Sequence, residues 1–451
     1  MSEPTDTIAA LATPVGTSAI ALIRVSGPDA AKLAEQIFRE LPPPRLAQHA
    51  DYRDRRGELV DDVLFTFFAG PNSFTGEDSL EISCHGNPFV AQKIVEDLLA
   101  RGCRSAEAGE FSKRAFLSGR LDLSQAEAIM DLIHARSERA LAMANQQLRG
   151  ALGRRMEDLT SRLIRILAKI EAYIDFPEED LPVEDAATIR RELEETLAGT
   201  RQLIATSHYG TLLRDGIKTI IVGEPNAGKS SLLNRLVGHE RALVSAEPGT
   251  TRDYLEERII MGPHWLRLID TAGLNPSPGA LERQGIEKAL EQAETADLYL
   301  WVVDSSRELP SLPGALASRM GPVNTVMILN KVDLAPVAGI ERIMHTYPVV
   351  RVSALKGTGI EQLQLVVTKM ADAFQINVGG DLIAINARHL QALEQARHGL
   401  DAAMAKLDAR SDKELMASDL RCTLEAFGQI AGRIDNERIL DELFATFCIG
   451  K

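Results

Sequence analysis

A glycine-rich stretch at residues 223–230 has the residue types and the spacing of a phosphate-binding loop. It reads GEPNAGKS, so four residues separate its two glycines, and a lysine and a serine follow. An apolar, β-branched run at 217–222 precedes it and apolar residues at helical spacing follow it, which predicts a strand, a loop and a helix in that order. The glycines let backbone N–H groups turn toward phosphate oxygens, Lys229 reaches the outer phosphates and Ser230 can ligate Mg²⁺. The sequence therefore predicts a site for a nucleoside triphosphate.

Two further segments belong to the phosphate end of this site. The tetrapeptide DTAG at 270–273 follows another predicted strand. Asp270 would hold Mg²⁺ through a water molecule, and the N–H group of Gly273 would meet the γ-phosphate. The segment PGTTRD, 248–253, contains Thr251, which would complete the Mg²⁺ coordination when a γ-phosphate is present. We therefore expect this segment to act as a switch.

The base is predicted from two later elements, NKVD at 330–333 and the dipeptide Ser353-Ala354. The carboxylate of Asp333 accepts hydrogen bonds only, and it can take them from N1–H and the 2-amino group of guanine. Adenine offers neither donor at that place. The backbone N–H groups of Ser353 and Ala354 can donate to guanine O6. The glycine-rich loop, DTAG, NKVD and Ser353-Ala354, in this order and spacing, predict GTP.

The residue after DTAG is Leu274. In many GTPases a glutamine follows this motif and orients the attacking water. A leucine side chain cannot do so, which means that another group must position the water. Glu282, in the polar stretch just downstream, is the candidate, and an exposed helix residue without a catalytic role is the alternative.

Length and composition bound the rest of the chain. A chain of 451 residues is expected to hold about three domains, at ~150 residues each. No apolar run reaches the ~18 residues of a membrane span, and the first residues lack the basic region of a signal peptide. Four cysteines without CxxC spacing are expected to be reduced thiols in a cytoplasmic protein. They are Cys84, Cys103, Cys422 and Cys448.

The hydrophobic pattern changes along the chain. Residues 1–118 mix short apolar runs with turns and predict a small α+β domain. Residues 119–212 and 377–451 are helical, and 213–376 alternate strands and helices as parallel sheets do. The predicted fold class is multidomain α/β, with the parallel-sheet domain inserted into an all-helical domain.

Individual elements follow from the same pattern. Strands are predicted at 19–25, 63–68, 79–83, 217–222, 266–269 and 326–329, and one more ends at Val352. Helices are predicted at 30–39, 88–100, 390–407, 418–429 and 436–447, with amphipathic stripes at 159–173 and 189–204. A capping box from Ser124 to Glu127 is expected to begin a helix.

The net charge of −14 excludes an overall basic surface for nucleic acid. The charge is uneven, because residues 136–169 hold eight basic side chains against three acidic ones and 171–195 are mainly acidic. We interpret these stretches as two solvated helix faces. A contact of the basic stretch with RNA is the alternative.

Motifs outside the nucleotide site extend the argument to the whole chain. They are TP-x-G and IRVSG (13–27), PNSFTGED-x-x-EI-x-x-HG (71–86), GEFS-x-RAF (109–116), LDL-x-QAEAI (121–129), IDFPEE (174–179), RHLQALEQA (388–396) and the terminal FCIGK. With PNAGKSSLLN and GTTRD, and in this order, they resemble the MnmE (TrmE) family of tRNA-modification GTPases along the full length.

The resemblance implies a division of labour among the domains. It implies a tetrahydrofolate-binding and dimerisation domain at 1–118, a helical domain at 119–212 and 377–451, and an inserted P-loop, Ras-like G domain at 213–376. The implied homodimer works with the FAD-containing MnmG on certain tRNAs in the cytoplasm, without a membrane. Together they add a (carboxymethyl)aminomethyl group at C5 of the wobble uridine, position 34. Folate supplies the one-carbon unit, in the 5-formyl or 5,10-methylene form.

The resemblance also implies site residues. The folate contacts match Arg24, Glu81, Arg120 and Lys451; many relatives carry lysine at position 120, and arginine keeps its charge. The family hydrolyses GTP when two G domains meet across K⁺. The cation ligands match the Asn226 side chain and the backbone carbonyls of Ser245, Glu247 and Thr250. Glu282 matches the residue that orients the water, and Cys448 matches a functional thiol.

Motifs and resemblance together predict a set of nucleotide contacts. They are Asn226, Ala227, Gly228, Lys229, Ser230, Ser231, Ser245, Ala246, Glu247, Pro248, Gly249, Thr250, Thr251, Asp270, Thr271, Ala272, Gly273, Asn330, Lys331, Asp333, Ser353 and Ala354.

Two other functions share the G-domain motifs. An RNA-binding GTPase of ribosome assembly would need an RNA module such as a KH domain, and none is recognisable after residue 380. A septin-like GTPase that uses nucleotide to control assembly would leave the amino-terminal motifs and FCIGK without a role.

Overall fold

The computed structural model describes residues 6–175, 183–240, 256–270, 295–310, 314–334, 346–374, 382–409, 413–432 and 450. The chain divides into two compact units. One comprises Met1–Met130, Leu148–Ser161 and Arg421–Lys451, and the other comprises Asp131–Gln147 and Arg162–Leu420. No helix among the described residues is long and apolar enough to cross a membrane. The division into two units does not test the three predicted domains, which therefore remain a prediction.

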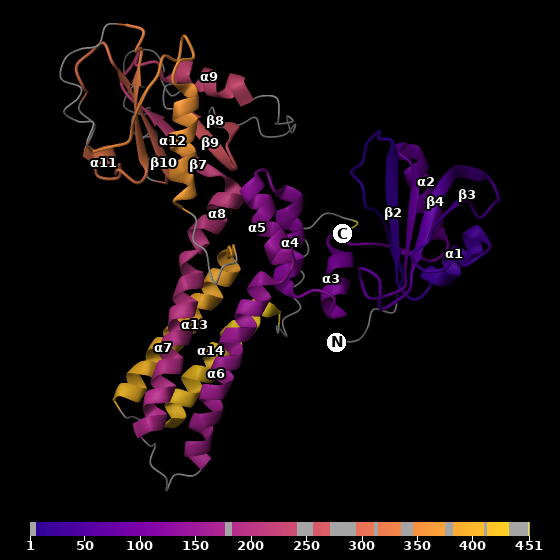
Figure 1. Cartoon of the computed structure of the whole chain (residues 1–451). Helices are drawn as coiled ribbons and strands as arrows, with labels where there is room; N and C mark the ends of the chain where they lie inside the picture. The colour runs from indigo at the N-terminus through magenta and orange to yellow at the C-terminus, as the bar shows by residue number, and fades with distance from the viewer. Residues whose placement is uncertain are drawn as a thin grey trace, which may run out of the picture. The chain divides into compact units, whose positions relative to one another are not determined.

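The first unit contains a six-stranded sheet with the order β3-β4-β5-β2-β1-β6. Figure 1 labels β2, β3 and β4 of this sheet. Its strands are β1 (Ile8–Leu11), β2 (Ile20–Ser26), β3 (Ala47–Arg53), β4 (Leu59–Phe68), β5 (Ser79–His85) and β6 (Arg104–Ser105). Only the β1–β6 pair is parallel. Helices α1 (Ala30–Phe38) and α2 (Pro88–Ala100) bury Ile23, Ile82 and Phe65 against one face of the sheet. Since side chains alternate along a strand, Arg24 and Glu81 lie on the other face.

Two further helices of this region are α3 (Glu110–Leu117) and α4 (Leu123–His134). The capping box of α4 lies two residues earlier than the sequence predicted. The Asp122 carboxylate accepts from the N–H of Gln125, and the Gln125 side-chain oxygen accepts from the N–H of Asp122. Ser124 instead donates to Asp122, because it already lies inside the first turn. The prediction of a capping box from Ser124 to Glu127 was therefore wrong.

The second unit contains a six-stranded sheet with the order β12-β11-β10-β7-β9-β8. Its strands are β7 (Ile217–Val222), β8 (Glu256–Met261), β9 (His264–Asp270), β10 (Leu298–Asp304), β11 (Thr325–Asn330) and β12 (Val349–Arg351). All pairs are parallel except β8 with β9. Helices in this part are α9 (Lys229–Glu240), α11 (Gly314–Ala317) and α12 (Ile360–Asp372). Buried residues cover both faces, as parallel sheets require.

The remaining helices among the described residues range from nine to 25 residues in length, and several of them are long (Figure 1). They are α5 (Glu138–Leu148), α6 (Ala151–Asp175), α7 (Val183–Ala205), α8 (Ser207–Asp215), α13 (Ala387–Asp408) and α14 (Lys413–Ala431). Basic residues of α6 pair with acidic residues of α7, since Arg162 lies against Glu195 and Lys169 lies 3.6 Å from Glu192. These pairs fit the interpretation of the charged stretches as helix faces. The helix predicted at 436–447 lies outside the described residues.

Candidate functional site

The glycine-rich loop connects β7 to α9, as predicted. Lys229 is buried at the first position of α9, and its ammonium group donates to the carbonyls of Gly223 (2.8 Å) and Glu224 (2.9 Å). The ammonium therefore lies inside the loop, together with the N-terminal N–H groups of a twelve-residue helix. This arrangement provides positive charge and donors for the phosphates of a nucleotide.

Both glycines of the loop are required by close contacts. Gly223 has φ +152°, and a Cβ there would lie 2.2 Å from the carbonyl oxygen of Val302. Gly228 has φ +96°, and a Cβ there would lie 2.2 Å from Nδ2 of Asn330. A side chain at Gly223 would push against the backbone of β10, and one at Gly228 would displace the side-chain amide of Asn330.

Asn330 joins the phosphate loop to the loop after β12. Its Nδ2 donates to the carbonyl of Ala227 (2.8 Å), and its Oδ1 accepts from the N–H of Ala354 (3.0 Å). The side chain is buried and both ends of its amide are satisfied. Two elements 127 residues apart in sequence are thereby brought together at the carboxyl edge of the sheet, where open α/β sheets bind ligands.

Asp333 is exposed beside this junction and is fixed by one neighbour. The hydroxyl of Ser353 donates to its Oδ1 at 2.6 Å, and this bond lowers the pKa of the Asp333 carboxyl. The group is therefore ionised and accepts hydrogen bonds only, as recognition of guanine N1–H and the 2-amino group requires.

The backbone N–H groups of Ser353 and Ala354 have partners within the protein. Ser353 donates to the carbonyl of Thr358 (3.0 Å), and Ala354 donates to Asn330. To donate to guanine O6, each N–H group would have to share its hydrogen between its present partner and the base. The role of these N–H groups in base recognition stays a prediction. A groove opens next to them between α9 and this loop, lined by Ser231, Asn234, Arg235, Gly238, Ala354 and Leu355.

Sequence reasoning missed one residue of this site, Asp304 at the end of β10. Its Oδ2 accepts from the ammonium of Lys331 at 2.7 Å, and the same ammonium donates to the carbonyl of Asn226 at 2.7 Å. Burial disfavours the charge on Asp304, but the hydrogen bonds from Lys331 and Ser306 outweigh it and lower the pKa of Asp304 to about 2. The available signal was an aspartate directly after the fully buried strand LYLWVV.

Several predicted residues lie outside the described part of the chain. They are Ser245, Ala246, Glu247, Pro248, Gly249, Thr250, Thr251, Thr271, Ala272, Gly273, Leu274, Glu282, Cys448 and Lys451. Asp270 ends β9, next to β7, and Ser230 occupies the second position of α9. The described residues contain no group of three or more His, Cys, Asp or Glu side chains that could hold a metal ion by themselves.

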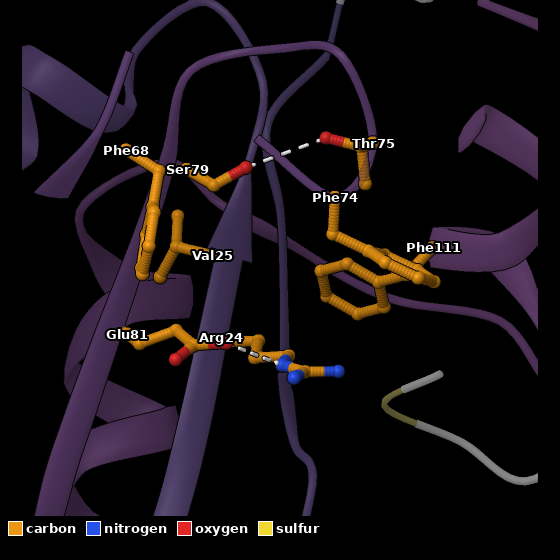
Figure 2. Close-up of a pocket in the computed structure, with 8 residues that line it drawn as sticks. All are labelled: Arg24, Val25, Phe68, Phe74, Thr75, Ser79, Glu81 and Phe111. Carbon is orange, nitrogen blue, oxygen red and sulfur yellow. Dashed lines mark hydrogen bonds and ion pairs between the residues drawn. The ribbon is translucent and has the colours of Figure 1, made fainter. Parts of the chain in front are cut away.

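A second site lies in the first unit, on the sheet face opposite α1 and α2. Figure 2 shows Arg24 and Glu81 side by side on β2 and β5, with the ring of Phe74 above the guanidinium. Arg24 Nε lies 2.8 Å from Glu81 Oε1, and its Cζ lies 5.8 Å from the centre of the Phe74 ring. The pocket has a volume of about 80 Å³. Its lining consists of Arg24, Val25, Phe68, Phe74, Thr75, Ser79, Glu81 and Phe111.

This pocket brings together two of the four predicted folate residues, Arg24 and Glu81. Its aromatic and ionic lining fits a flat, polar-edged ring system, but its volume is well below the ~300 Å³ of a pocket that encloses a small molecule. Arg120 is exposed and is not among the lining residues, although its Cγ is 3.4 Å from a Cβ built on Gly76, next to Thr75.

Hydroxyl groups hold the loop at 71–78, which carries Phe74 and Thr75. The Ser26 hydroxyl lies 2.7 Å from the Thr75 hydroxyl, and the Ser118 hydroxyl donates to the carbonyl of Thr75 at 2.6 Å. The pocket lining thus depends on residues from β2 and from the end of α3.

Beneath the loop lies a buried arginine, Arg114 of α3, which is only 3% exposed. Its guanidinium lies 2.8 Å from Asp6, 2.9 Å from Glu110 and 3.2 Å from Glu77 of the loop. Burial opposes the charge of Glu110, but hydrogen bonds from Arg104 and Arg114 outweigh it and lower the pKa of Glu110. The motif GEFS-x-RAF therefore supplies the ionic core under the pocket, a role that the sequence did not reveal.

The described cysteines are free thiols. Cys84 and Cys103 are buried, and burial raises the pKa of each to about 11. Cys422 is exposed.

Two family models match the chain. The model of the MnmE helical domain matches residues 123–448, and that of the GTP-binding protein TrmE N-terminus matches residues 7–120. The first match alone covers more than half of the chain.

Curated relatives match over almost their whole length. The tRNA modification GTPase MnmE of Opitutus terrae is 59% identical over 447 residues, which are 99% of this chain and 99% of the relative. The protein of the same name from Akkermansia muciniphila is 42% identical over 460 residues, with both chains fully covered. Among solved structures, the G domain of the Thermotoga maritima FeoB transporter is 24% identical and covers 34% of this chain and 98% of its own, with a TM-score of 0.26.

Proposed function

The chain belongs to the MnmE family of tRNA modification GTPases, and on this premise we propose that it binds and hydrolyses GTP in the modification of wobble uridine in tRNA. The observation that best supports GTP binding is the position of Asn330. Its side chain joins the phosphate loop to the loop after β12, and Asp333 is exposed beside it. The ribosome-assembly and septin-like alternatives gain no support from relatives that match end to end under one name.

At the phosphate end, Lys229 and the first N–H groups of α9 bind and orient the β- and γ-phosphates. Ser230 and Thr251 would ligate Mg²⁺ directly, and Asp270 would hold it through water. The ion supplies positive charge where negative charge develops during hydrolysis. At the base end, the ionised Asp333 accepts from guanine.

Leu274 leaves the attacking water without the usual glutamine. We assign its orientation to Glu282. The side chain of Asn226 and the carbonyls of Ser245, Glu247 and Thr250 would hold K⁺ between two G domains. The cation supplies the fixed positive charge that an arginine finger gives in other GTPases. An exposed amide on the phosphate loop fits this role.

GTP turnover in KCl and in NaCl, at equal ionic strength, tests this mechanism. K⁺ should accelerate turnover roughly 10³-fold, at the lower end of what an arginine finger contributes, whereas Na⁺ should not. Asn226→Ala should lose the K⁺ response. Glu282→Ala should lose the stimulated rate and keep its affinity for GTP. Equal rates of the wild type in the two salts would overturn the cation site, and a fully active Glu282→Ala would overturn only the water-positioning role.

We propose that the pocket of the first unit binds the pterin end of a tetrahydrofolate, which supplies the one-carbon unit. Arg24, Glu81 and Arg120 would contact it, and Lys451 would reach its carboxylate. The small volume of the pocket in one chain supports a site that is completed across a homodimer. Titration of 5-formyltetrahydrofolate into wild type and Arg24→Ala by calorimetry tests the assignment, and equal affinities would remove the pocket from the site.

We further propose that the homodimer works with MnmG in the cytoplasm, where tRNA is the substrate. Nucleoside analysis of tRNA from cells that lack this chain should show loss of the (carboxymethyl)aminomethyl group at the wobble uridine. An unchanged nucleoside profile would overturn the proposed reaction and leave the GTPase assignment intact.

A further inference from the structure

Two turns of the nucleotide site hold a residue other than glycine in the left-handed region. They are Asn226 of the phosphate loop, with φ +65°, and Lys331 of the base loop, with φ +63°. Asparagine tolerates this conformation because its short side chain can bond locally, but lysine has no such compensation. The turn at Lys331 therefore needs an anchor outside its own backbone.

The side chain of Lys331 provides the connection. Its ammonium donates to the carbonyl of Asn226 and to Oδ2 of Asp304, each at 2.7 Å. One charged group thus bridges the two turns and a strand end. The bond to Asp304 joins two charges, and charge-assisted bonds are the stronger kind.

Asp304 is itself held on its other oxygen. Oδ1 accepts from the N–H of Ser306 at 3.0 Å and from its hydroxyl at 2.6 Å, and the carboxylate is only 8% exposed. The next cation, Arg307, lies 3.8 Å away and is largely exposed. The carboxylate is therefore aimed at Lys331 by the turn that follows β10.

We propose that Asp304 is a positioning residue of the GTP site, which acts through Lys331 to hold the base loop and Asn226 in one arrangement. Guanine recognition and the cation response are then coupled through a single ammonium group. This inference rests on the proposed function, in which Asn226 binds K⁺.

A double-mutant cycle on the full-length protein tests the positioning role. The release of a fluorescent GDP analogue is measured for wild type, Asp304→Asn, Lys331→Met and the double variant. Each single variant should release the analogue about tenfold faster, the factor that corresponds to one lost charged hydrogen bond. The double variant should be no faster than Lys331→Met alone, because Asp304 acts only through Lys331.

Arg307→Gln is the matched control, because it removes a charge beside Asp304 without touching Lys331, and it should release the analogue within twofold of wild type. Multiplicative effects in the double variant would overturn the proposal, since they would mean that Asp304 acts elsewhere. If Asp304→Asn fails to fold, as judged by its melting temperature, Ser306→Ala takes its place. This variant should raise the release rate two- to threefold, and an unchanged rate would overturn the proposal.

The coupling has a separate readout. In Asp304→Asn, the KCl concentration that gives half-maximal GTP turnover should rise several-fold, because Asn226 is less firmly held. An unchanged half-maximal concentration, together with faster GDP release, would overturn the coupling. If the wild type shows no K⁺ response, the cation site of the proposed function fails, and the release cycle in Na⁺ still decides the role of Asp304.

Discussion

The nucleotide site of the second unit consists of loops at the carboxyl ends of β7, β10, β11 and β12, whereas the pocket of the first unit consists of side chains on one face of a mostly antiparallel sheet. In the nucleotide site, main-chain groups and a few short-range motifs define the geometry, with Asn330 as the link. In the pocket, residues from β2, β5, a loop and α3 must all be in place. Loss of a single contact should therefore be enough to weaken binding at the nucleotide site. Binding at the pocket should instead be lost when the domain as a whole is destabilised.

The largest effect expected from this difference is at Arg114. In Arg114→Met, Glu77 and Glu110, which are mostly buried, and Asp6, which is 44% exposed, lose the buried guanidinium that they share. The free energy of unfolding of the first unit should fall by about 3–5 kcal/mol, and folate binding should be lost with it. Chemical denaturation followed by hydrogen exchange at α3 measures this. Arg104→Met, whose guanidinium is 43% exposed, should cost only about 1 kcal/mol; equal losses would contradict the role of burial.

A single contact is the target in the second prediction. Asp333→Asn replaces one acceptor by an amide donor, so GTP affinity should fall about hundredfold, as expected for two hydrogen bonds to a charged group. Affinity for xanthosine triphosphate should rise, and the stability of the unit should not change. Calorimetry with both nucleotides measures this, with Glu361→Gln on the surface of α12 as the control. Wild-type GTP affinity in Asp333→Asn would refute the base site.

The third prediction is that the second unit loses stability at a higher pH than the first when the solution is acidified. His264 of β9 is 2% exposed and lies 2.9 Å from Asp372, near Arg139. Burial lowers the pKa of His264 despite the neighbouring carboxylate. Because its pKa is lower in the folded state, the unfolded chain takes up the proton first as the pH falls through about 6.5. The stability that depends on neutral His264 is therefore complete above that pH and is lost below it.

The first unit should lose stability only at lower pH. The pKa values of Asp6 and Glu110 are lowered in the folded state, so their contribution is present above about pH 4 and is lost below it. Between pH 6.5 and 5, the second unit should lose stability and the first should lose none. Hydrogen exchange at β9 and at α3 resolves the units. In His264→Gln the loss at β9 should vanish, and its persistence would assign the acid response to another group.

The smallest effect is expected at the end of the chain. Deletion of Lys451 should weaken binding of 5-formyltetrahydrofolate by at most about fivefold, the range of one exposed ion pair. GTP affinity should be unaffected, because the nucleotide site is built elsewhere. Calorimetry with both ligands checks the prediction, and unchanged folate affinity would remove Lys451 from the site.

Sequence motifs predicted individual strands and helices because their signals are short and local. The strand at 217–222 has the predicted bounds, and the helix predicted at 88–100 does too. Asn330, Asp333 and Ser353 were identified because each belongs to a motif that follows a buried strand. Asp304 was missed because it contacts Lys331 only when β10 and β11 lie side by side.

The pocket could be predicted only through family resemblance. Arg24 and Glu81 are 57 residues apart and meet because β2 and β5 pair in one register. Ser26, Thr75 and Arg114 come from three separate motifs, and no periodicity connects them. Long-range register and buried ion networks depend on the whole domain, so local patterns do not encode them.

The contact of Gly228 with Asn330 has an evolutionary consequence. A methyl group at position 228 would occupy the place of the Asn330 amide. A substitution at one of these positions therefore requires a compensating substitution at the other. The two residues belong to motifs that are usually read as independent signatures, one for phosphate and one for base. We therefore expect substitutions at the two positions to occur together. A mutation at position 228 of the phosphate loop should also reduce selectivity for guanine.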